Sequence, residues 1–516
     1  MRFSYCPVRL IFVSRPFCLV RAGRVLFPAL ALSACVATPD LGRQPTLRSV
    51  DDVAASESLG GEAASAWPVD GWWKAYGDPQ LDQLMEEGLR ASPDMAAAAA
   101  RFRQATAAAR EAGAALLPSA DLEASAAATR QSYNMGLPKD FVPQGWLGTG
   151  RIALDAAFDL DLWGKNRAAL AAATSEAEAA RIDARQAQLA LTTALADAYA
   201  ELARLYDQHD IQQRTLEIRS ASQKLVSQRQ RNGLETRGNV RQADATVSSA
   251  RAQLAALDQS IAVRQHQIAA LIGAGPDRGL SIQRPRLENL AARGLPADIT
   301  TNLVARRPDI AAALARAEAA AKRVKVARAD FYPAIRLSAL IGIQSLGYNT
   351  DSNFLAPTST GPRPFTDTLF SKDSLFGSVG PAISLPIFHG GAIRARYRGA
   401  RGAYDEAVAI YDKTVIGAYQ EVADAVTGRR NMERRLAAAR EALTASEEAY
   451  AIARKRYNGG LFTFLDVLNV EDQMLATRQS LAELEASAFT IDIALIRALG
   501  GGFTPRDALS KDMPHG

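Results

Sequence analysis

The residues that most often carry enzymatic or metal chemistry are sparse in this 516-residue sequence. No two of its four histidines have the spacing of paired metal ligands, and no glycine-rich phosphate loop, nucleophile elbow or carboxylate pair with a plausible site is present. The histidines are His209, His266, His389 and His515. The sequence therefore predicts a protein that is not an enzyme, binds no cofactor or metal, and supplies no energy for transport.

All three cysteines lie within the first 35 residues. Residues 1–34 carry five arginines and no acid, and they include the apolar run "VLFPALALSA", which predicts an export signal. If that signal is removed, Cys35 is the only cysteine left, so no disulfide forms within one chain. "LSAC" at 32–35 resembles the lipobox of bacterial lipoproteins. That resemblance implies lipidation of Cys35 and, because Val36 follows, outer-membrane sorting; an ordinary signal peptide is the alternative.

The net charge of +5 and the pI of about 9.1 suggest nucleic-acid binding, but the five leader arginines account for the whole excess. We therefore predict no nucleic-acid partner. Beyond the leader, no run of 18 or more apolar residues occurs, which excludes a spanning helix and leaves β-strands as the only spanning elements.

One acid stands in an apolar setting within a long proline-free stretch. Asp466 lies in "RYNGGLFTFLDVLNVED" (456–472), shortly after Gly459-Gly460. "RQRNGLETRGNVRQADA" (229–245) resembles the same phrase. Glycine permits tight chain reversals, so both stretches predict a turn between two helices.

The chain contains an internal duplication. Pro93 aligns with Pro308 at an offset of 215, and Gly273 aligns with Gly500 at an offset of 227. Each copy is predicted to run helix, strand, loop, strand, long helix, turn and helix. The first long helix, from about Trp163 to residue 231, would be roughly 100 Å long. Its seam repeats at steps of four and three residues, as in a coiled coil: Leu195, Tyr199, Leu202 and Tyr206.

Four segments alternate apolar and polar residues with the period of a β-strand. In "RIALDAAFDLDLW" (151–163) the even positions are apolar, and three odd positions are acidic: Asp155, Asp159 and Asp161. Aromatic residues flank the segments at both ends, as in membrane-spanning strands: Phe331, Tyr332, Trp163 and Phe388 near the helices, and Tyr133, Trp146, Tyr348 and Phe376 near the loops. Because a sheet in lipid must close and a filled barrel needs about eight strands, several chains must share one barrel.

The mature chain resembles the TolC-like outer-membrane channels, most closely the NodT-type efflux lipoproteins. The resemblance rests on "LSAC", "WWKAYGDPQLDQL" (72–84), "LDLWGKNR", "LPIFHGG" (385–391), "AYQEVADAV" (418–426) and "RYNGGLFTFLDVLNVEDQML". It implies a homotrimer in which four strands per chain build a shared 12-stranded β-barrel. The barrel continues into a long periplasmic α-helical barrel with an equatorial domain. The implied partners are outer-membrane lipid, a periplasmic adaptor (membrane fusion protein) and an inner-membrane pump of the RND type.

The resemblance also implies that the glycine-bearing turns form a periplasmic tip where the tunnel narrows to a gate. The implied tip glycines are Gly233, Gly238, Gly459 and Gly460, and the implied gate residues are Asp466, Leu465, Asn469, Asn239 and Tyr457. Asp466 would give a ring of three carboxylates, or would merely be an acid favoured at a helix N-terminus. Tyr457 and Arg456 would hold the gate shut through hydrogen bonds to neighbouring helices. Asp155, Asp159 and Asp161 would face the barrel lumen and keep it wet.

The expected boundaries follow from these landmarks. They are 1–34 leader, 35–91 N-terminal and equatorial part, 92–273 first repeat, 274–306 equatorial linker, 307–500 second repeat and 501–516 tail. Strands are expected at about 118–130, 150–163, 333–345 and 376–388, and tip turns at 232–238 and 458–463.

The sequence thus predicts the outer-membrane exit duct of a tripartite efflux system, passively conducting drugs or other small toxic compounds in a Gram-negative bacterium. Three alternatives stay open. They are the duct of a type I protein secretion system, a periplasmic adaptor, and a coiled-coil lipoprotein without a pore. An adaptor should show one helical hairpin flanked by β-rich domains rather than a duplicated strand pair.

Overall fold

The structure is a computed structural model that describes residues 38–49, 53–60, 65–134, 136, 145–287, 295–346 and 364–504. The leader, Cys35 and Tyr348 lie outside this part. The chain forms two compact units. The first contains Met1–Gln44, Ala112–Ala169 and Lys322–Gly402, and the second contains Pro45–Glu111, Leu170–Ala321 and Ala403–Gly516.

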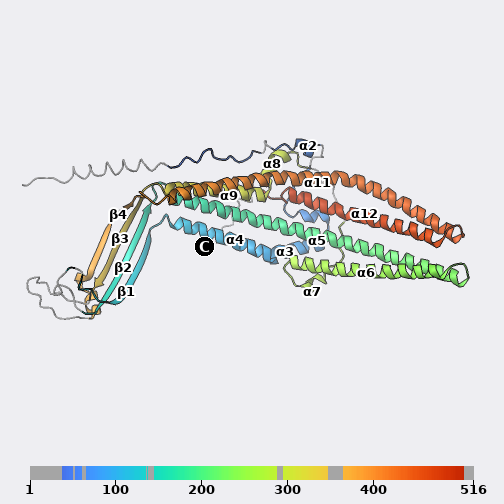
Figure 1. Cartoon of the computed structure of the whole chain (residues 1–516), viewed down its shortest axis with the longest axis horizontal. Coiled ribbons are helices and arrows are strands. Elements are labelled where there is room, and N and C mark those ends of the chain that lie inside the picture. Colours follow the sequence, from blue (N-terminus) through green and yellow to red (C-terminus); the bar gives the residue numbers. More distant parts are fainter. Residues whose placement is uncertain are drawn as a thin grey trace, which may run out of the picture. The chain divides into compact units, whose positions relative to one another are not determined.

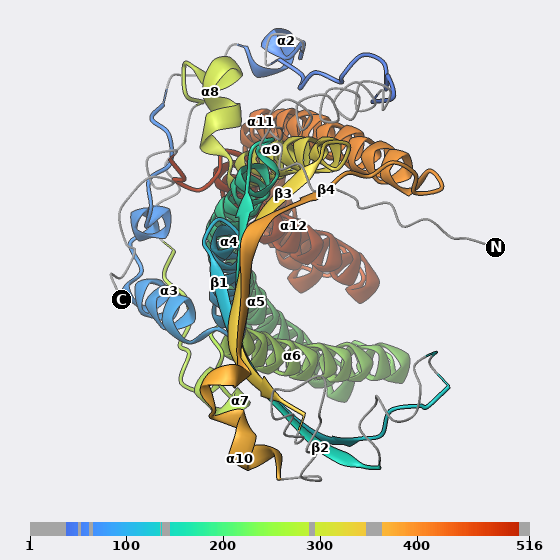
Figure 2. The ribbon, with the colours of Figure 1, turned by 90° about the vertical axis from the view of Figure 1, so that its left-hand side faces the viewer.

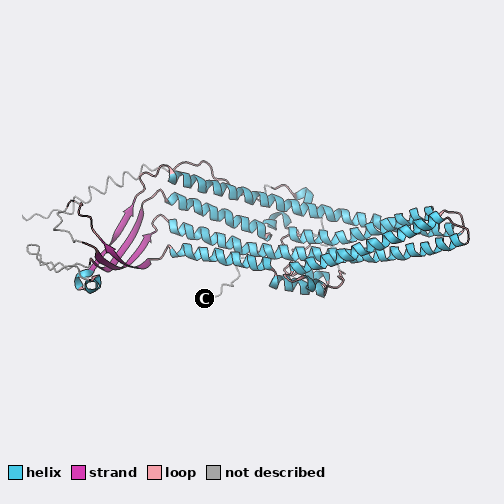
Figure 3. Ribbon diagram, turned by 60° about the horizontal axis from the view of Figure 1, so that its bottom comes forward, coloured by secondary structure: helices cyan, strands magenta, loops and turns pink. Residues whose placement is uncertain are grey.

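The first unit is built on a four-stranded antiparallel sheet with the order β1-β2-β3-β4 (Figure 3). The strands are β1 (Ser119–Thr129), β2 (Leu147–Leu160), β3 (Ala334–Ser345) and β4 (Leu375–Ser384). β4 ends four residues before the expected boundary, shortly before Pro386, which has no N–H to donate to the ladder. β1 and β4 are the edges of this sheet.

The register places the apolar alternation of all four strands on one face. Leu122 pairs with Leu154, Leu154 pairs with Ile341, and Leu337 pairs with Phe158. Large apolar side chains on this face remain exposed within the chain: Leu122, Leu154, Leu337, Ile341, Val379 and Ile383. The opposite face is polar. There Asp121 pairs with Asp155, and Asp159 pairs with Arg336.

Aromatic side chains pack at one end of the sheet, and a short helix packs at the other. Where β2 leads into the helices, the Trp163 ring stacks on Tyr332 at 4.8 Å, and its Nε1–H donates to the Pro333 carbonyl oxygen at 2.7 Å. At the other end, Phe365 of α10 (Phe365–Leu369) lies over Gly148 and Gly150, where a Cβ at residue 150 would come within 2.4 Å of the ring. The short 3-10 helix η5 (Lys372–Ser374) follows α10.

The duplication reappears as three pairs of helices of equal length (Figure 1). The 22-residue helices are α4 (Pro93–Ala114) and α9 (Pro308–Ala329). The 67-residue helices are α5 (Lys165–Arg231) and α11 (Ala392–Asn458). The 35-residue helices are α6 (Arg237–Leu271) and α12 (Phe464–Ala498). In the second unit α5 pairs with α6 and α11 pairs with α12, forming two hairpins. No described helix is long and apolar enough to cross a membrane.

Two apolar clusters form most of the core of the second unit. One joins η3 (Trp72–Tyr76) and α3 (Pro79–Ala91) to α5, α6 and α12, and it buries the expected coiled-coil residues Leu195, Tyr199 and Leu202 completely. The other joins α2 (Ser56–Leu59) and α8 (Ile299–Arg306) to α9, α11 and α12 (Figure 2). The short α7 (Pro276–Gly279) contacts α6.

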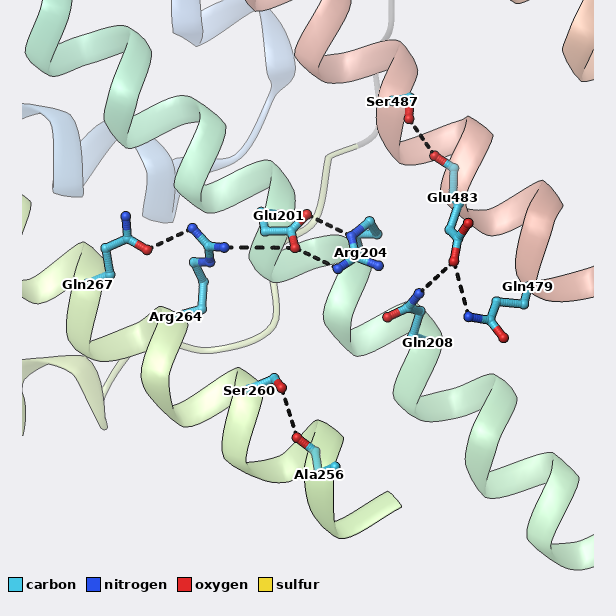
Figure 4. A network of polar contacts seen from close by, with 10 residues as sticks. All are labelled: Glu201, Arg204, Gln208, Ala256, Ser260, Arg264, Gln267, Gln479, Glu483 and Ser487. Atoms are coloured by element: carbon cyan, nitrogen blue, oxygen red, sulfur yellow. Dashed lines mark hydrogen bonds and ion pairs between the residues drawn. The ribbon is translucent and has the colours of Figure 1, made fainter. Parts of the chain in front are cut away.

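Polar contacts tie α5 to both neighbouring helices (Figure 4). The Glu201 carboxylate accepts hydrogen bonds from Arg204 and lies 3.8 Å from the Arg264 guanidinium of α6. Gln208 of α5 donates to Glu483 of α12 at 3.3 Å. Thus α5 connects the two hairpins within the second unit.

Each repeat ends on a left-handed glycine packed against the start of the 22-residue helix. A Cβ on Gly273 would lie 2.5 Å from the Ala91 carbonyl oxygen, and one on Gly500 would lie 2.0 Å from that of Arg306. Both glycines have positive φ, +79° and +85°. The aligned pairs Pro93/Pro308 and Gly273/Gly500 therefore mark the same contact in both copies.

We predict that Gly500→Ala destabilises the fold by more than the ~1–2 kcal/mol of left-handed strain, because its methyl group has no room. Gly233→Ala is the matched control, since Gly233 has a φ of +74° but no heavy atom within 4 Å of an added Cβ. Thermal unfolding of the purified protein measures both. Equal losses for the two variants would contradict the proposed contact.

Candidate functional site at the helix turns

The two turns between the long and 35-residue helices have the same geometry. The first covers residues 232–236 and the second 459–463. Gly233 and Gly460 occupy equivalent positions with φ of +74° and +78°. Gly459 and Gly238 do not adopt left-handed backbone, and Gly238 is the second residue of α6. In each turn, only one of the two expected glycines therefore has the left-handed backbone conformation that favours glycine.

Asp466 closes a capping box at the N-terminus of α12. Its N–H donates to Thr463 Oγ1 at 3.3 Å, and its Oδ2 accepts from the Thr463 N–H at 2.8 Å and hydroxyl at 2.7 Å. The donation from Thr463 holds the pKa of the exposed Asp466 carboxyl below its ordinary value. The observed contacts of Asp466 are thus those of a helix cap, and its charge stays in solvent.

The other expected gate residues of α12 share that exposed side. Leu465 and Asn469 are exposed, as is Asp466. The opposite side of the helix is buried in a cluster with the other hairpin: Phe464, Val467, Leu468, Glu471, Met474 and Leu475.

Tyr457 links the two turns. The side chain is 3 % exposed, and its hydroxyl donates to Glu235 Oε1 at 2.8 Å. The Arg229 guanidinium carbon lies 4.7 Å from the centre of the Tyr457 ring, and Arg229 Nη1 donates to the Tyr457 carbonyl oxygen at 3.4 Å. Burial, reinforced by Glu235, raises the pKa of the Tyr457 phenol above its ordinary value.

Asn239 joins the same contacts from the other side. Its Nδ2 donates to Glu235 Oε2 at 2.6 Å, so one carboxylate holds both Tyr457 and Asn239. We call Tyr457, Glu235, Asn239 and Arg229 the cross-hairpin link. Arg456 differs from the expectation, since its guanidinium faces Phe462 of its own turn at 5.1 Å.

Sequence reasoning missed Glu235 and Arg229. Glu235 stands two residues after Gly233, and the aligned position in the second copy holds Phe462, so comparing the copies does not point to a shared acid. Arg229 aligns with Arg456 at the offset of 227, and this correspondence was the available signal.

The expected lumen acids divide into two kinds. Asp155 and Asp159 lie on the polar face of the sheet, where Asp159 forms an ion pair with Arg336 at 2.7 Å. Asp161 does not fit the expectation. β2 ends at Leu160, and the Asp161 side chain is only 9 % exposed because its carboxylate accepts the N–H groups of Asn166 and Arg167 at the start of α5.

A cavity of about 630 Å³ lies in the first unit, where the strands lead into the helices. Its charged groups are paired, with Asp330 2.7 Å from Lys165 and 3.4 Å from Arg396. Across the described ranges, no three histidine, cysteine or acidic side chains gather as a metal site would require.

Comparisons with known proteins agree with this architecture. The sequence model of the outer membrane efflux protein family matches residues 84–274 and 300–501. The pyoverdine export outer membrane protein OpmQ of Pseudomonas putida is 30% identical over 479 residues, covering 92% of this chain and 96% of its own. The multidrug resistance outer membrane protein MdtP of an Escherichia coli strain is 31% identical, covering 87% and 90%.

A solved structure is similar over nearly as much of the chain. The outer membrane protein VceC of Vibrio cholerae superimposes with a TM-score of 0.76 and 41% identity, over 85% of this chain and all of that one. The matched family is one of transport ducts rather than enzymes. The chain therefore belongs to the outer membrane efflux protein family, and it is a TolC-like exit duct in the outer membrane of a Gram-negative bacterium.

Proposed function

We propose that three copies of this chain join their sheets into one 12-stranded barrel and pass small toxic compounds out of the cell. An inner-membrane pump of the RND type and a periplasmic adaptor would deliver the compounds. Lipidation of Cys35 would add an anchor in the outer membrane.

The observation that carries the proposal is the apolar face of the sheet. Its large side chains are exposed in the single chain, Val379 to 79 % and Leu122 to 71 %. Burying them in hydrocarbon would be favourable by about 25 cal/mol per Å². Lipid also requires that edge strands find partners, and β1 and β4 could pair with each other between neighbouring copies.

The cargo class is supported by the names of the relatives. OpmQ is named for pyoverdine export and MdtP for multidrug resistance. Both names point to small molecules rather than proteins, which favours efflux over protein secretion. The apolar face and the duplicated strand pairs also distinguish this chain from an adaptor.

The turns between the helices would form the periplasmic gate. The cross-hairpin link joins them through a buried phenol and a carboxylate, and such a hydrogen bond to a charged group contributes about 1.5–3 kcal/mol. Opening the gate would require Tyr457 to leave Glu235. Asp466, Leu465 and Asn469, on the exposed side of α12, would border the aperture.

A charge on the apolar face should block membrane assembly. Leu337→Arg places a guanidinium where we expect hydrocarbon, at a cost of about 2–4 kcal/mol near the bilayer midplane. Ser338→Arg, one residue away on the opposite face, is the matched control. We expect trimers in outer-membrane fractions for the control and few or none for Leu337→Arg. Equal recovery of both would refute the assigned face.

Removing the phenol hydroxyl should loosen the gate. Tyr457→Phe keeps the ring on Arg229 but removes the hydrogen bond to Glu235, so we expect more frequent opening of purified channels in planar bilayers. Tyr332→Phe, beside the sheet, controls for loss of a tyrosine hydroxyl elsewhere. Unchanged conductance and opening in Tyr457→Phe would exclude the link from gating.

Deleting the gene should sensitise the bacterium to a set of small toxic compounds, and the intact gene should restore resistance. Measuring the levels of exported proteins in the same strains distinguishes small-molecule efflux from type I protein secretion. Normal resistance with loss of a secreted protein would favour type I secretion and reject the proposed cargo.

A further inference from the structure

An ionisable residue lies in the apolar seam that holds α12 against the other hairpin. The buried positions of α12 after the turn are spaced by three, one, three and three residues, as in a coiled-coil seam. Phe464, Val467, Leu468 and Met474 are apolar, but Glu471 between them is also completely buried. An apolar side chain would fill this place without the cost of burying a carboxylate.

The contacts of Glu471 come from both hairpins. The Tyr450 hydroxyl of α11 donates to its Oε2 at 3.2 Å, and the hydroxyl of Ser222 of α5 also acts to lower the pKa of the carboxyl. Arg219 of α5 approaches Oε1 only to 3.9 Å, because its Nη2 donates to Asp472 at 2.8 Å.

The pairing of this buried carboxylate is therefore incomplete. Among the described residues, neither Glu471 Oε1 nor Arg219 Nε has a hydrogen-bond partner. Removing a charge from water costs several kcal/mol, which a pair offsets only when its geometry is excellent. Here the closest approach of the guanidinium and carboxylate is longer than a hydrogen bond.

Titratable and charged groups surround Glu471 on three of the four helices packed here. They are Arg219 on α5, Tyr450 with Arg454 on α11, and Asp472 on α12 itself, whereas α6 contributes the Thr246 carbonyl, which accepts from Arg219. Burial raises the pKa of Glu471 above its ordinary value, although Tyr450 and Arg219 lower it. Burial together with the Glu471 charge also raises the pKa of Tyr450 to about 12.

We propose that Glu471 is a positioning residue of the gate, whose buried and partly unpaired carboxylate weakens the contact between the two hairpins and so favours opening. This inference rests on the proposed gate. When the hairpins separate, water reaches the carboxylate and the burial cost disappears. The charge thus acts opposite to the cross-hairpin link, which holds the same hairpins together.

The direction of the pH dependence follows from linkage. Glu471 binds its proton more tightly when the hairpins are packed than when they are apart, so acid stabilises the packed state. This stabilisation is complete below the ordinary pKa and is lost as the pH rises through the raised one. Opening should therefore become less frequent as the pH falls toward the ordinary carboxyl value.

Glu471→Gln tests this because it keeps the shape and removes the charge. In planar bilayers we expect channels that open several-fold less often than wild type near neutral pH and show little pH dependence between about pH 5 and pH 8. Glu485→Gln is the matched control, since it removes an exposed acid of the same helix that pairs with Arg440 of α11, and it should keep the wild-type pH dependence. Tyr450→Phe removes a hydrogen bond that stabilises the carboxylate, so it should open more often.

The outcomes separate the inference from the gate itself. If Tyr457→Phe alters opening but Glu471→Gln opens as often as wild type, or more often, the role of Glu471 is wrong and the gate stands. If none of these variants alters opening, the gate proposal fails too. Trimer recovery from the membrane checks each variant for assembly, and Tyr450→Phe tests the inference independently if Glu471→Gln does not assemble.

Discussion

The apolar alternation of four strands on one face of a single sheet is the constraint on which the rest of this structure depends. Antiparallel register brings Leu122, Leu154 and Ile341 onto adjacent strands of that face. Such a surface must be buried, and its edges must be paired wherever water is absent. The polar opposite face, with Asp155 and the Asp159–Arg336 pair, suits a water-filled interior.

The long helices depend on a different constraint, which is packing against partner helices. A helix of 67 residues is stabilised chiefly by packing along its length rather than by intrinsic propensity. Here the duplication supplies the partners, because each 67-residue helix is accompanied by helices of 22 and 35 residues. Each repeat also ends on a glycine that packs against the carbonyl oxygen of the last residue of α3 or α8, and α5 carries polar contacts to both α6 and α12.

In the proposed gate, two acids near the turns, the half-buried Glu235 and the buried Glu471, have opposite effects on the packing of the hairpins. Glu235 is fully used, since its two oxygens accept from Tyr457 and Asn239. Glu471 is more deeply buried, and one of its oxygens has no donor among the residues that the structure describes. The first carboxylate stabilises the packed hairpins, whereas the second makes their packing costly. If the turns form the proposed gate, closing firmly and still opening would require both effects to be of similar size.

The sequence by itself determined the duplication, the strand parity, the long helices, the turns and the family. These features depend on local periodicity or on glycine and proline, whose backbone preferences are intrinsic. Tertiary structure alone decided which side chains meet. Glu235 and Tyr457 are 222 residues apart in the chain, and local periodicity does not reveal contacts over such a separation. The sequence also does not distinguish the buried Glu471 from a surface glutamate, because it does not show which face of α12 is packed. Asp161 alternates as a strand residue but caps α5, because the strand ends one residue earlier and the helix N–H groups need an acceptor.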